Sequence, residues 1–168
     1  MVTTYIILGI IGFVIIVFIG IYNALIRRRN HVEEAWSDIE VQMKRRYDLI
    51  PNVVETVKGY AAHEKGLLEN VTQARTAAMG ATSAAEHATA ENMLTGTLKT
   101  LFAVAENYPD LKANANFLDL QRELADTENK IQSARRFYNT QVRDLNTMIE
   151  SFPSNIIAGM FSFVKKDF

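Results

Sequence analysis

Residues 6–21 read IILGIIGFVIIVFIGI, an apolar run that only glycines interrupt and that lies close to the start of the chain. The uncharged segment extends over residues 2–26, and all 18 Lys and Arg and all 19 Asp and Glu follow it. At 1.5 Å per residue, about 25 residues form roughly 37 Å of helix, against about 30 Å for the hydrocarbon core of a bilayer. We therefore predict a membrane-spanning helix over residues 5–26, preceded by a short tail at residues 1–4.

The predicted span carries its own anchoring residues. Tyr5 and Tyr22 stand near its two ends, where amphipathic aromatic rings favour the membrane interface. A cleaved signal peptide is the alternative, but no Lys or Arg precedes the apolar core, and the core is longer than such peptides need. The residues that we expect to anchor the chain in lipid are Tyr5, Ile6, Phe13, Val14, Phe18 and Tyr22.

Three arginines, Arg27, Arg28 and Arg29, follow the apolar segment directly. Because the tail before the span has no positive charge, the positive-inside bias places the N-terminus outside the cell and the rest of the chain in the cytoplasm. The arginines could also bind anionic lipid headgroups, at roughly 1 kcal/mol each. A topology signal is the simpler interpretation.

From residue 31 apolar side chains recur every three or four residues, which is typical of a helix that packs on other helices. This stripe crosses Pro51, which removes a backbone donor and clashes with the preceding turn. We predict one helix over residues 31–79 with a kink near Pro51, and two helices joined at Pro51 as the alternative. The stripe consists of Val32, Trp36, Ile39, Met43, Tyr47 and Ile50, and then Val53, Val54, Val57, Tyr60, Ala61, Leu67, Leu68, Val71 and Ala74.

Two more helices are expected, over about residues 84–107 and from an N-cap at Asn116 to residue 151. The second of them has the most heptad-like apolar stripe of the chain, which predicts coiled-coil-like packing. The predicted fold is therefore all-α: a transmembrane helix followed by an antiparallel bundle of long helices. The bundle forms a cytoplasmic domain at residues 27–151, and an apolar C-terminal segment follows at 152–168.

The composition excludes several functions. The net charge of −1 and the pI of about 6.3 lack the basic excess of nucleic-acid-binding proteins. The chain has no cysteine, so it has no disulfide, thiolate metal site or cysteine nucleophile. His63-Glu64 opens like a zinc-protease motif, but Leu67 stands where the second histidine belongs. No catalytic motif is present, so we expect no enzymatic activity, no cofactor and no bound metal.

A basic cluster, Lys44-Arg45-Arg46, is the strongest charge feature of the bundle. It could bind an anion or a headgroup. The simpler interpretation is an exposed helix face, because Asp48 lies close by and Glu40 is placed to pair with Lys44 across one helical turn.

The C-terminal segment is more apolar than a solvated terminus needs to be. It could pack on its own bundle, on another subunit or on the membrane. Helices of roughly 73, 36 and 54 Å in alternating directions would leave it far from its own span. That geometry favours contact with the bundle or with a neighbouring copy. The residues expected to make such contacts are Phe152, Ile156, Ile157, Met160, Phe161 and Phe163.

The chain also resembles a known family, the LemA family of small bacterial membrane proteins. The resemblance covers essentially the whole chain and implies one N-terminal span, with a cytosolic helical bundle at the bacterial inner membrane. It implies no reaction. The segments that carry it are YNAL (22–25), RRN (28–30), EAWSDI (34–39), KRRYDLIPN (44–52), VKGY (57–60), HE (63–64), AENYPDLKAN (105–114), TENKI (127–131), ARRFYN (134–139) and FPSN (152–155).

Two functions remain open from the sequence. The first is a non-enzymatic, single-pass bundle protein that forms homo-oligomers and organises or shapes the inner membrane, with the bilayer and other copies of itself as partners. The alternative is an adaptor or signalling accessory that binds another membrane protein or a protease. No nucleic-acid partner is expected.

Overall fold

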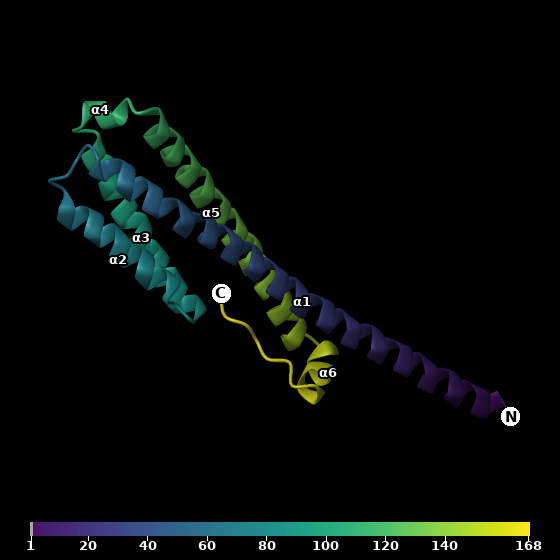
Figure 1. Ribbon diagram of the computed structural model, residues 1–168. Helices are drawn as coiled ribbons and strands as arrows, with labels where there is room; N and C mark the ends of the chain where they lie inside the picture. Colours follow the sequence, from purple (N-terminus) through teal and green to yellow (C-terminus); the bar gives the residue numbers. More distant parts are fainter. Residues whose placement is uncertain (1) are drawn as a thin grey trace. The chain divides into compact units, whose positions relative to one another are not determined.

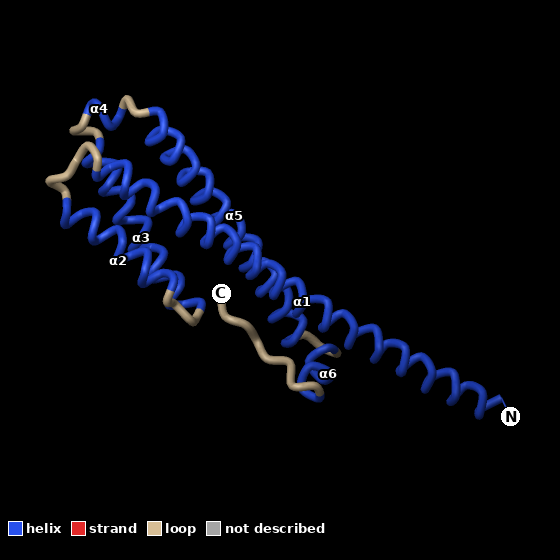
Figure 2. Tube along the Cα trace, viewed as in Figure 1, coloured by secondary structure: helices blue, strands red, loops and turns tan. Residues whose placement is uncertain are grey.

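The computed structural model describes residues 2–168 of the chain, apart from the side chain of Ala84. Helices and their connections account for all of this range (Figure 2), which confirms the all-α prediction. Residue 1 of the predicted N-terminal tail lies outside the described residues. The helices are α1 (Val2–Lys58), α2 (Lys65–Met79), α3 (Ala84–Ala105), α4 (Pro109–Lys112), α5 (Ala115–Glu150) and α6 (Ser154–Met160).

These helices form two compact units. The anchor unit combines the chain up to Asp38 with Ala134–Phe168, and the bundle unit is Ile39–Ser133. Because α1 and α5 are long, each contributes one part to each unit.

The bundle unit packs the second part of α1, α2, α3 and the first part of α5 around a shared core. α2 and α3 lie side by side (Figure 1), joined by a short turn. α5 runs antiparallel to α1, because Thr56 pairs with Asn116 whereas Arg45 pairs with Glu123 and Asp126. The antiparallel bundle is thus confirmed. Its buried apolar residues include Ile39, Met43, Ile50, Val53, Val57, Val71, Leu94, Leu98, Leu101, Leu111, Leu120, Leu124 and Ile131.

The helix predicted over residues 31–79 is wrong in one respect. α1 runs through Pro51 and ends at Lys58, and α2 begins only at Lys65. The connection contains Gly59, and glycine destabilises a helix because it loses more backbone entropy than other residues when it is held there. Hydrogen bonds hold this connection: Asn114 Nδ2 donates to the Tyr60 hydroxyl at 2.9 Å, and the Tyr108 hydroxyl donates to Glu64 Oε1 at 2.9 Å.

The corner before α5 differs slightly from the prediction. α5 begins at Ala115, and the side chain of Asn114 caps it by accepting from the Phe117 amide at 2.9 Å. Asn116, the predicted cap, instead donates to Thr56 at 3.3 Å. The Asn-rich corner therefore does the expected capping with a different asparagine.

Arg75 explains why α1 continues through Pro51. Proline has no amide hydrogen, so the carbonyl of Tyr47 one turn earlier loses its helical donor. Arg75 Nε from α2 donates to that carbonyl at 2.7 Å. A charged donor from a neighbouring helix thus replaces the missing backbone hydrogen bond, which a pattern read along one helix does not reveal.

Replacing Arg75 with methionine is expected to lower the free energy of unfolding by about 1–3 kcal/mol, because the Tyr47 carbonyl loses its donor. Thermal unfolding followed by circular dichroism measures the loss. The double variant Arg75→Met with Pro51→Ala restores the backbone donor and should recover most of it. Equal stability of the single variant and the wild-type chain would contradict this role for Arg75.

A capping box begins α3. Ser83 Oγ accepts from the Glu86 amide at 3.2 Å, and Glu86 Oε2 accepts from both the amide and the hydroxyl of Thr82 at 2.9 Å. The two hydrogen bonds from Thr82, first that from its amide, lower the pKa of the Glu86 carboxyl below its ordinary value of 4.5. The capping hydrogen bonds from Thr82 therefore favour the ionised form of the Glu86 carboxyl.

A carboxyl group with a lowered pKa in the folded state stabilises the fold above its ordinary pKa, and this contribution is lost as the pH falls through the folded value. We expect the start of α3 to loosen as the pH drops below about 4.5, seen as a fall in the protection factor of the Thr82 amide, which is its exchange rate relative to the intrinsic rate at the same pH. Glu86→Gln should remove the pH dependence of this protection factor. A dependence that persists in Glu86→Gln would assign it to another group.

Candidate membrane interface

The first part of α1 has the properties of a membrane span. It is the one helix in residues 2–168 that is long and apolar enough to cross a bilayer, and none of its most apolar window is buried within the protein. Four of the predicted anchor residues have exposed side chains, and that of Phe13 is 67% exposed: Tyr5, Ile6, Phe13 and Val14. Phe18 and Tyr22 are only half-buried, because other parts of the anchor unit pack on them.

The three arginines after the span are arranged differently from one another. Arg28 forms an ion pair with Asp144 of α5 at 3.0 Å. Arg29 lies 3.9 Å from Glu33, and its guanidinium lies 5.8 Å from the centre of the Phe163 ring. Arg27 is exposed. Arg28 and Arg29 therefore hold the anchor unit together as well as supplying positive charge next to the span.

The α6 helix packs directly on the C-terminal half of the predicted span. Leu25 is fully buried against Ile157 and Ala158, with Phe18, Ile21, Tyr22, Met148, Ile149 and Phe163 around them. The ring of Phe161 lies 4.7 Å from that of Tyr22 and 6.0 Å from that of Phe18, between ring centres.

The prediction that the C-terminal segment lies far from its own span is therefore wrong. That prediction counted three helical passes after the membrane, whereas the connection at residues 59–64 adds a reversal. With α1, α2, α3 and α5 in alternating directions, α5 runs antiparallel to α1 in the bundle unit. In the anchor unit α5 also runs antiparallel to α1. Two contacts show this: the rings of Trp36 and Tyr138 lie 5.4 Å apart, and Arg28 pairs with Asp144.

The chain after α6 returns along α5 and is fastened there. Lys165 pairs with Glu150, and Asn146 both donates to the Lys166 carbonyl at 2.8 Å and accepts from the Lys166 amide at 2.9 Å. The Tyr138 hydroxyl donates to the Asp167 carbonyl at 3.0 Å. Burial, followed by the nearby Asp167 carboxylate, raises the pKa of Tyr138. The hydroxyl therefore stays a donor at neutral pH.

The predicted C-terminal contact residues divide into two groups. Ile157 is buried and Phe163 half-buried, both against the chain's own helices. Phe152, Ile156 and Met160 point away from the folded chain, with exposed fractions of 80%, 54% and 65%. Phe161 is 47% exposed, and its ring packs on Phe18 and Tyr22. An apolar surface that the protein itself leaves uncovered thus lies beside the span.

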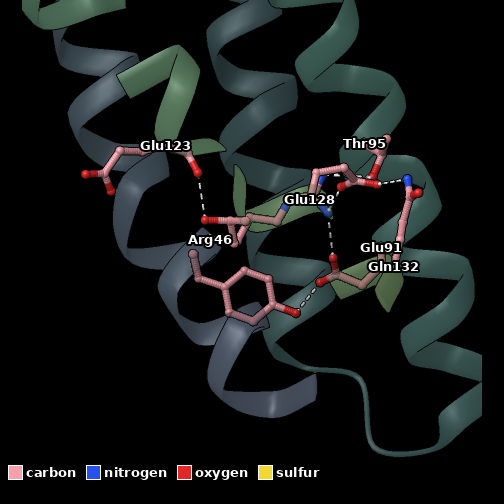
Figure 3. Close-up of polar contacts among 8 residues, drawn as sticks. Arg46, Glu91, Thr95, Glu123, Glu128 and Gln132 are labelled. Atoms are coloured by element: carbon pink, nitrogen blue, oxygen red, sulfur yellow. Dashed lines mark hydrogen bonds and ion pairs between the residues drawn. The ribbon is translucent and has the colours of Figure 1, made fainter. Parts of the chain in front are cut away.

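The basic cluster of the bundle divides: Lys44 and Arg45 lie on an exposed face, as the sequence interpretation had it, whereas Arg46 does not. Arg46 is buried in the bundle unit, where it contacts Glu91 at 3.0 Å, Glu128 at 2.9 Å and the Thr95 hydroxyl at 2.7 Å (Figure 3). Tyr47 donates its hydroxyl hydrogen to the other oxygen of Glu91. The stripe placed Tyr47 in the core, but nothing in the local sequence marked its neighbour Arg46 as buried.

This buried network joins three helices. Arg46 and Tyr47 come from α1, Glu91 from α3 and Glu128 from α5. Its charged groups are committed to one another, which suits a structural role. In residues 2–168 no group of three or more His, Asp or Glu side chains is placed to hold a metal ion.

A helix whose most apolar window is unburied and long enough to cross a bilayer, joined to an antiparallel bundle, defines a membrane-associated helical protein. The chain belongs to the LemA family, whose family model matches residues 35–168. It is 30% identical to a protein LemA of Metamycoplasma hominis over 88% of this chain and 68% of that protein. It is 21% identical to magnetosome proteins MamQ of Paramagnetospirillum magneticum and Magnetospirillum gryphiswaldense, over 88% of this chain and 64% of each relative. The chain thus spans about two thirds of the length of these relatives.

Proposed function

We propose that the protein is a non-enzymatic, single-pass scaffold of the bacterial inner membrane that self-associates and organises or shapes the bilayer. The observation that carries the proposal is the uncovered apolar surface beside the span, at Phe152, Ile156 and Met160. A surface of this kind can act on the membrane, because it is fixed to the span through Leu25 and Ile157. The proposed topology has the N-terminus outside and the bundle in the cytoplasm, following Arg27, Arg28 and Arg29.

Anchoring in a membrane favours self-association, because it restricts the diffusion and the orientation of the molecule. An anchored chain diffuses in two dimensions with one orientation, so weak lateral contacts act at a high effective concentration. Apolar side chains also remain at the surface of the helices outside the span, such as Val41 at 60% and Phe137 at 50% exposure.

The proposal is tested with the full-length chain reconstituted in liposomes at increasing protein density. We expect cross-linked ladders above the dimer and vesicles whose shape changes with density in electron micrographs. A peptide of residues 1–30 in the same vesicles is the control for the effect of a span alone. Monomers at every density in unchanged vesicles would refute the proposal.

The adaptor function keeps one observation in its favour. An open groove of about 560 Å³ in the bundle unit lies between α1 and α2, lined by Val54 and Leu68 and flanked by Glu55, Lys58, Lys65 and Glu69. A mixed apolar and charged groove suits a peptide segment of a partner protein. A photo-cross-linker at Thr72 in the groove should then capture one defined protein, whereas the same group at Thr82 should not. Equal capture at both positions would remove this alternative.

A further inference from the structure

We propose that residues 151–164 form a re-entrant hairpin that inserts into the cytoplasmic leaflet beside the span. This inference rests on α1 crossing the membrane, and it deepens the proposed function by giving the uncovered surface one occupant, the lipid acyl chains. Self-association is not needed for it.

The depth of the hairpin follows from its contacts with α1. About 20 helical residues cross the hydrocarbon core, and every 20-residue stretch within residues 2–26 contains Phe18. Such a stretch ends between residues 21 and 26, so Phe18 lies roughly 5–12 Å inside the cytoplasmic boundary. The ring of Phe161 packs on Phe18 at 6.0 Å and on Tyr22, one turn nearer the boundary, at 4.7 Å, which places it between the boundary and about 12 Å inside it. This range includes the 5–10 Å to which interfacial helices insert.

The composition of the hairpin suits that position. No residue from 151 to 164 is charged, and 14 residues are too few to cross a bilayer. Charged residues flank the segment on both sides, and the first of them, Glu150 and Lys165, pair with each other. The chain thus enters and returns on the same side, with an ion pair closing the base of the hairpin.

Both faces of α6 are apolar, which a helix bounded by water would not need. One face, Ile157 and Ala158, is buried against Leu25. The opposite face carries Ile156 and Met160, which lie one helical turn apart and are each more than half exposed. Since contact with Phe18 already places this helix at the depth of the acyl chains, lipid surrounds the outer face without requiring a second protein.

Several backbone amides of the hairpin are hydrogen-bonded within the chain, which favours its placement in hydrocarbon. The amides of Asn155, Phe161 and Phe163 donate to the carbonyls of Ser151, Ile157 and Ala158 at 2.7, 3.1 and 2.9 Å. The hydroxyl of Ser154 donates to the Met148 carbonyl at 2.6 Å.

Fluorescence quenching on the full-length chain tests the insertion. Because the chain has no cysteine, Ile156→Cys and Met160→Cys each accept a single environment-sensitive fluorophore. The labelled proteins are reconstituted in phosphatidylcholine–phosphatidylglycerol vesicles, with lipid nitroxide at acyl carbon 5 or iodide in water as quencher. Val14→Cys serves as the reference inside the span, and Met93→Cys, 53% exposed on α3, as the reference in water.

We expect both hairpin labels to be quenched by the nitroxide, and quenched by iodide about tenfold less than the Met93 label, because hydrocarbon excludes the ion. Iodide quenching equal to that at Met93 would overturn the proposal, as would protection from both quenchers, which indicates a protein cover. An unquenched Val14 label would instead show that the span itself fails. If either label lowers the helix content, Phe152→Cys, at 80% exposure, replaces it.

Discussion

Replacing Arg46 with methionine is expected to lower the free energy of unfolding by about 3–5 kcal/mol, because a buried ion pair that loses one partner leaves a carboxylate without compensation. Glu91 is 1% exposed and Glu128 is 28% exposed, so Glu91 suffers most. Urea unfolding of the full-length chain in detergent micelles, followed by circular dichroism, measures the change.

Two further variants distinguish the cost of leaving a buried carboxylate unpaired from the cost of losing an arginine side chain. The double variant Arg46→Met with Glu91→Leu removes both charges and should be more stable than Arg46→Met alone, because no buried carboxylate is left unpaired on α3. Arg45→Met, whose side chain is 41% exposed and pairs with Glu123 and Asp126, is the control, with an expected cost below about 1 kcal/mol. A cost at Arg46 no larger than at Arg45 would refute the importance of the network.

Replacing Leu25 with alanine is expected to release α6 from the span. Leu25 is fully buried against Ile157 and Ala158, and removing such a side chain costs about 2–5 kcal/mol. Since 1.4 kcal/mol is a factor of ten, amide hydrogen exchange at Ile157 should rise by at least about 30-fold.

The matched control for Leu25 is Ile19→Ala. Ile19 lies on the same helix but is 51% exposed, so its truncation should leave the exchange of α6 unchanged. Exchange at Val71 in the bundle unit serves as a second reference, since it should respond to neither variant. Equal exchange of α6 in the Leu25 and Ile19 variants would show that Leu25 does not hold α6.

The recurrence of apolar residues every three or four positions predicted most of the helices. In the stripe from Val32 to Ile50 every residue is buried except Trp36, which is half-buried. The heptad-like stripe expected in the last long helix is largely buried too, at Phe117, Leu120, Leu124, Ile131, Tyr138, Val142 and Leu145. In α3, Met93 is 53% exposed, whereas Leu94, Leu98 and Leu101 are buried. The alanine-rich start of that helix leaves few large side chains to fix which face turns inward.

The candidate interface was only partly visible in the sequence. Its residues from Phe152 to Phe163 were singled out because they are apolar, but their position beside Phe18 was not. That position depends on the number of chain reversals, and a single turn at Gly59 changes it. The buried Arg46 was missed for a related reason: its partners Glu91 and Glu128 are 45 and 82 residues away in sequence.

The sequence by itself determined an apolar helix long enough to cross a bilayer, the helical class and most of the residues that face the core. Hydrophobic periodicity acts locally along the chain, so a short window is enough to reveal it. Only the tertiary structure decided that Arg75 replaces the hydrogen bond lost at Pro51, that Arg46 is buried with two carboxylates, and that α6 returns to the span. These features join residues far apart in sequence, so they arise from how the helices pack and not from the pattern of any one helix.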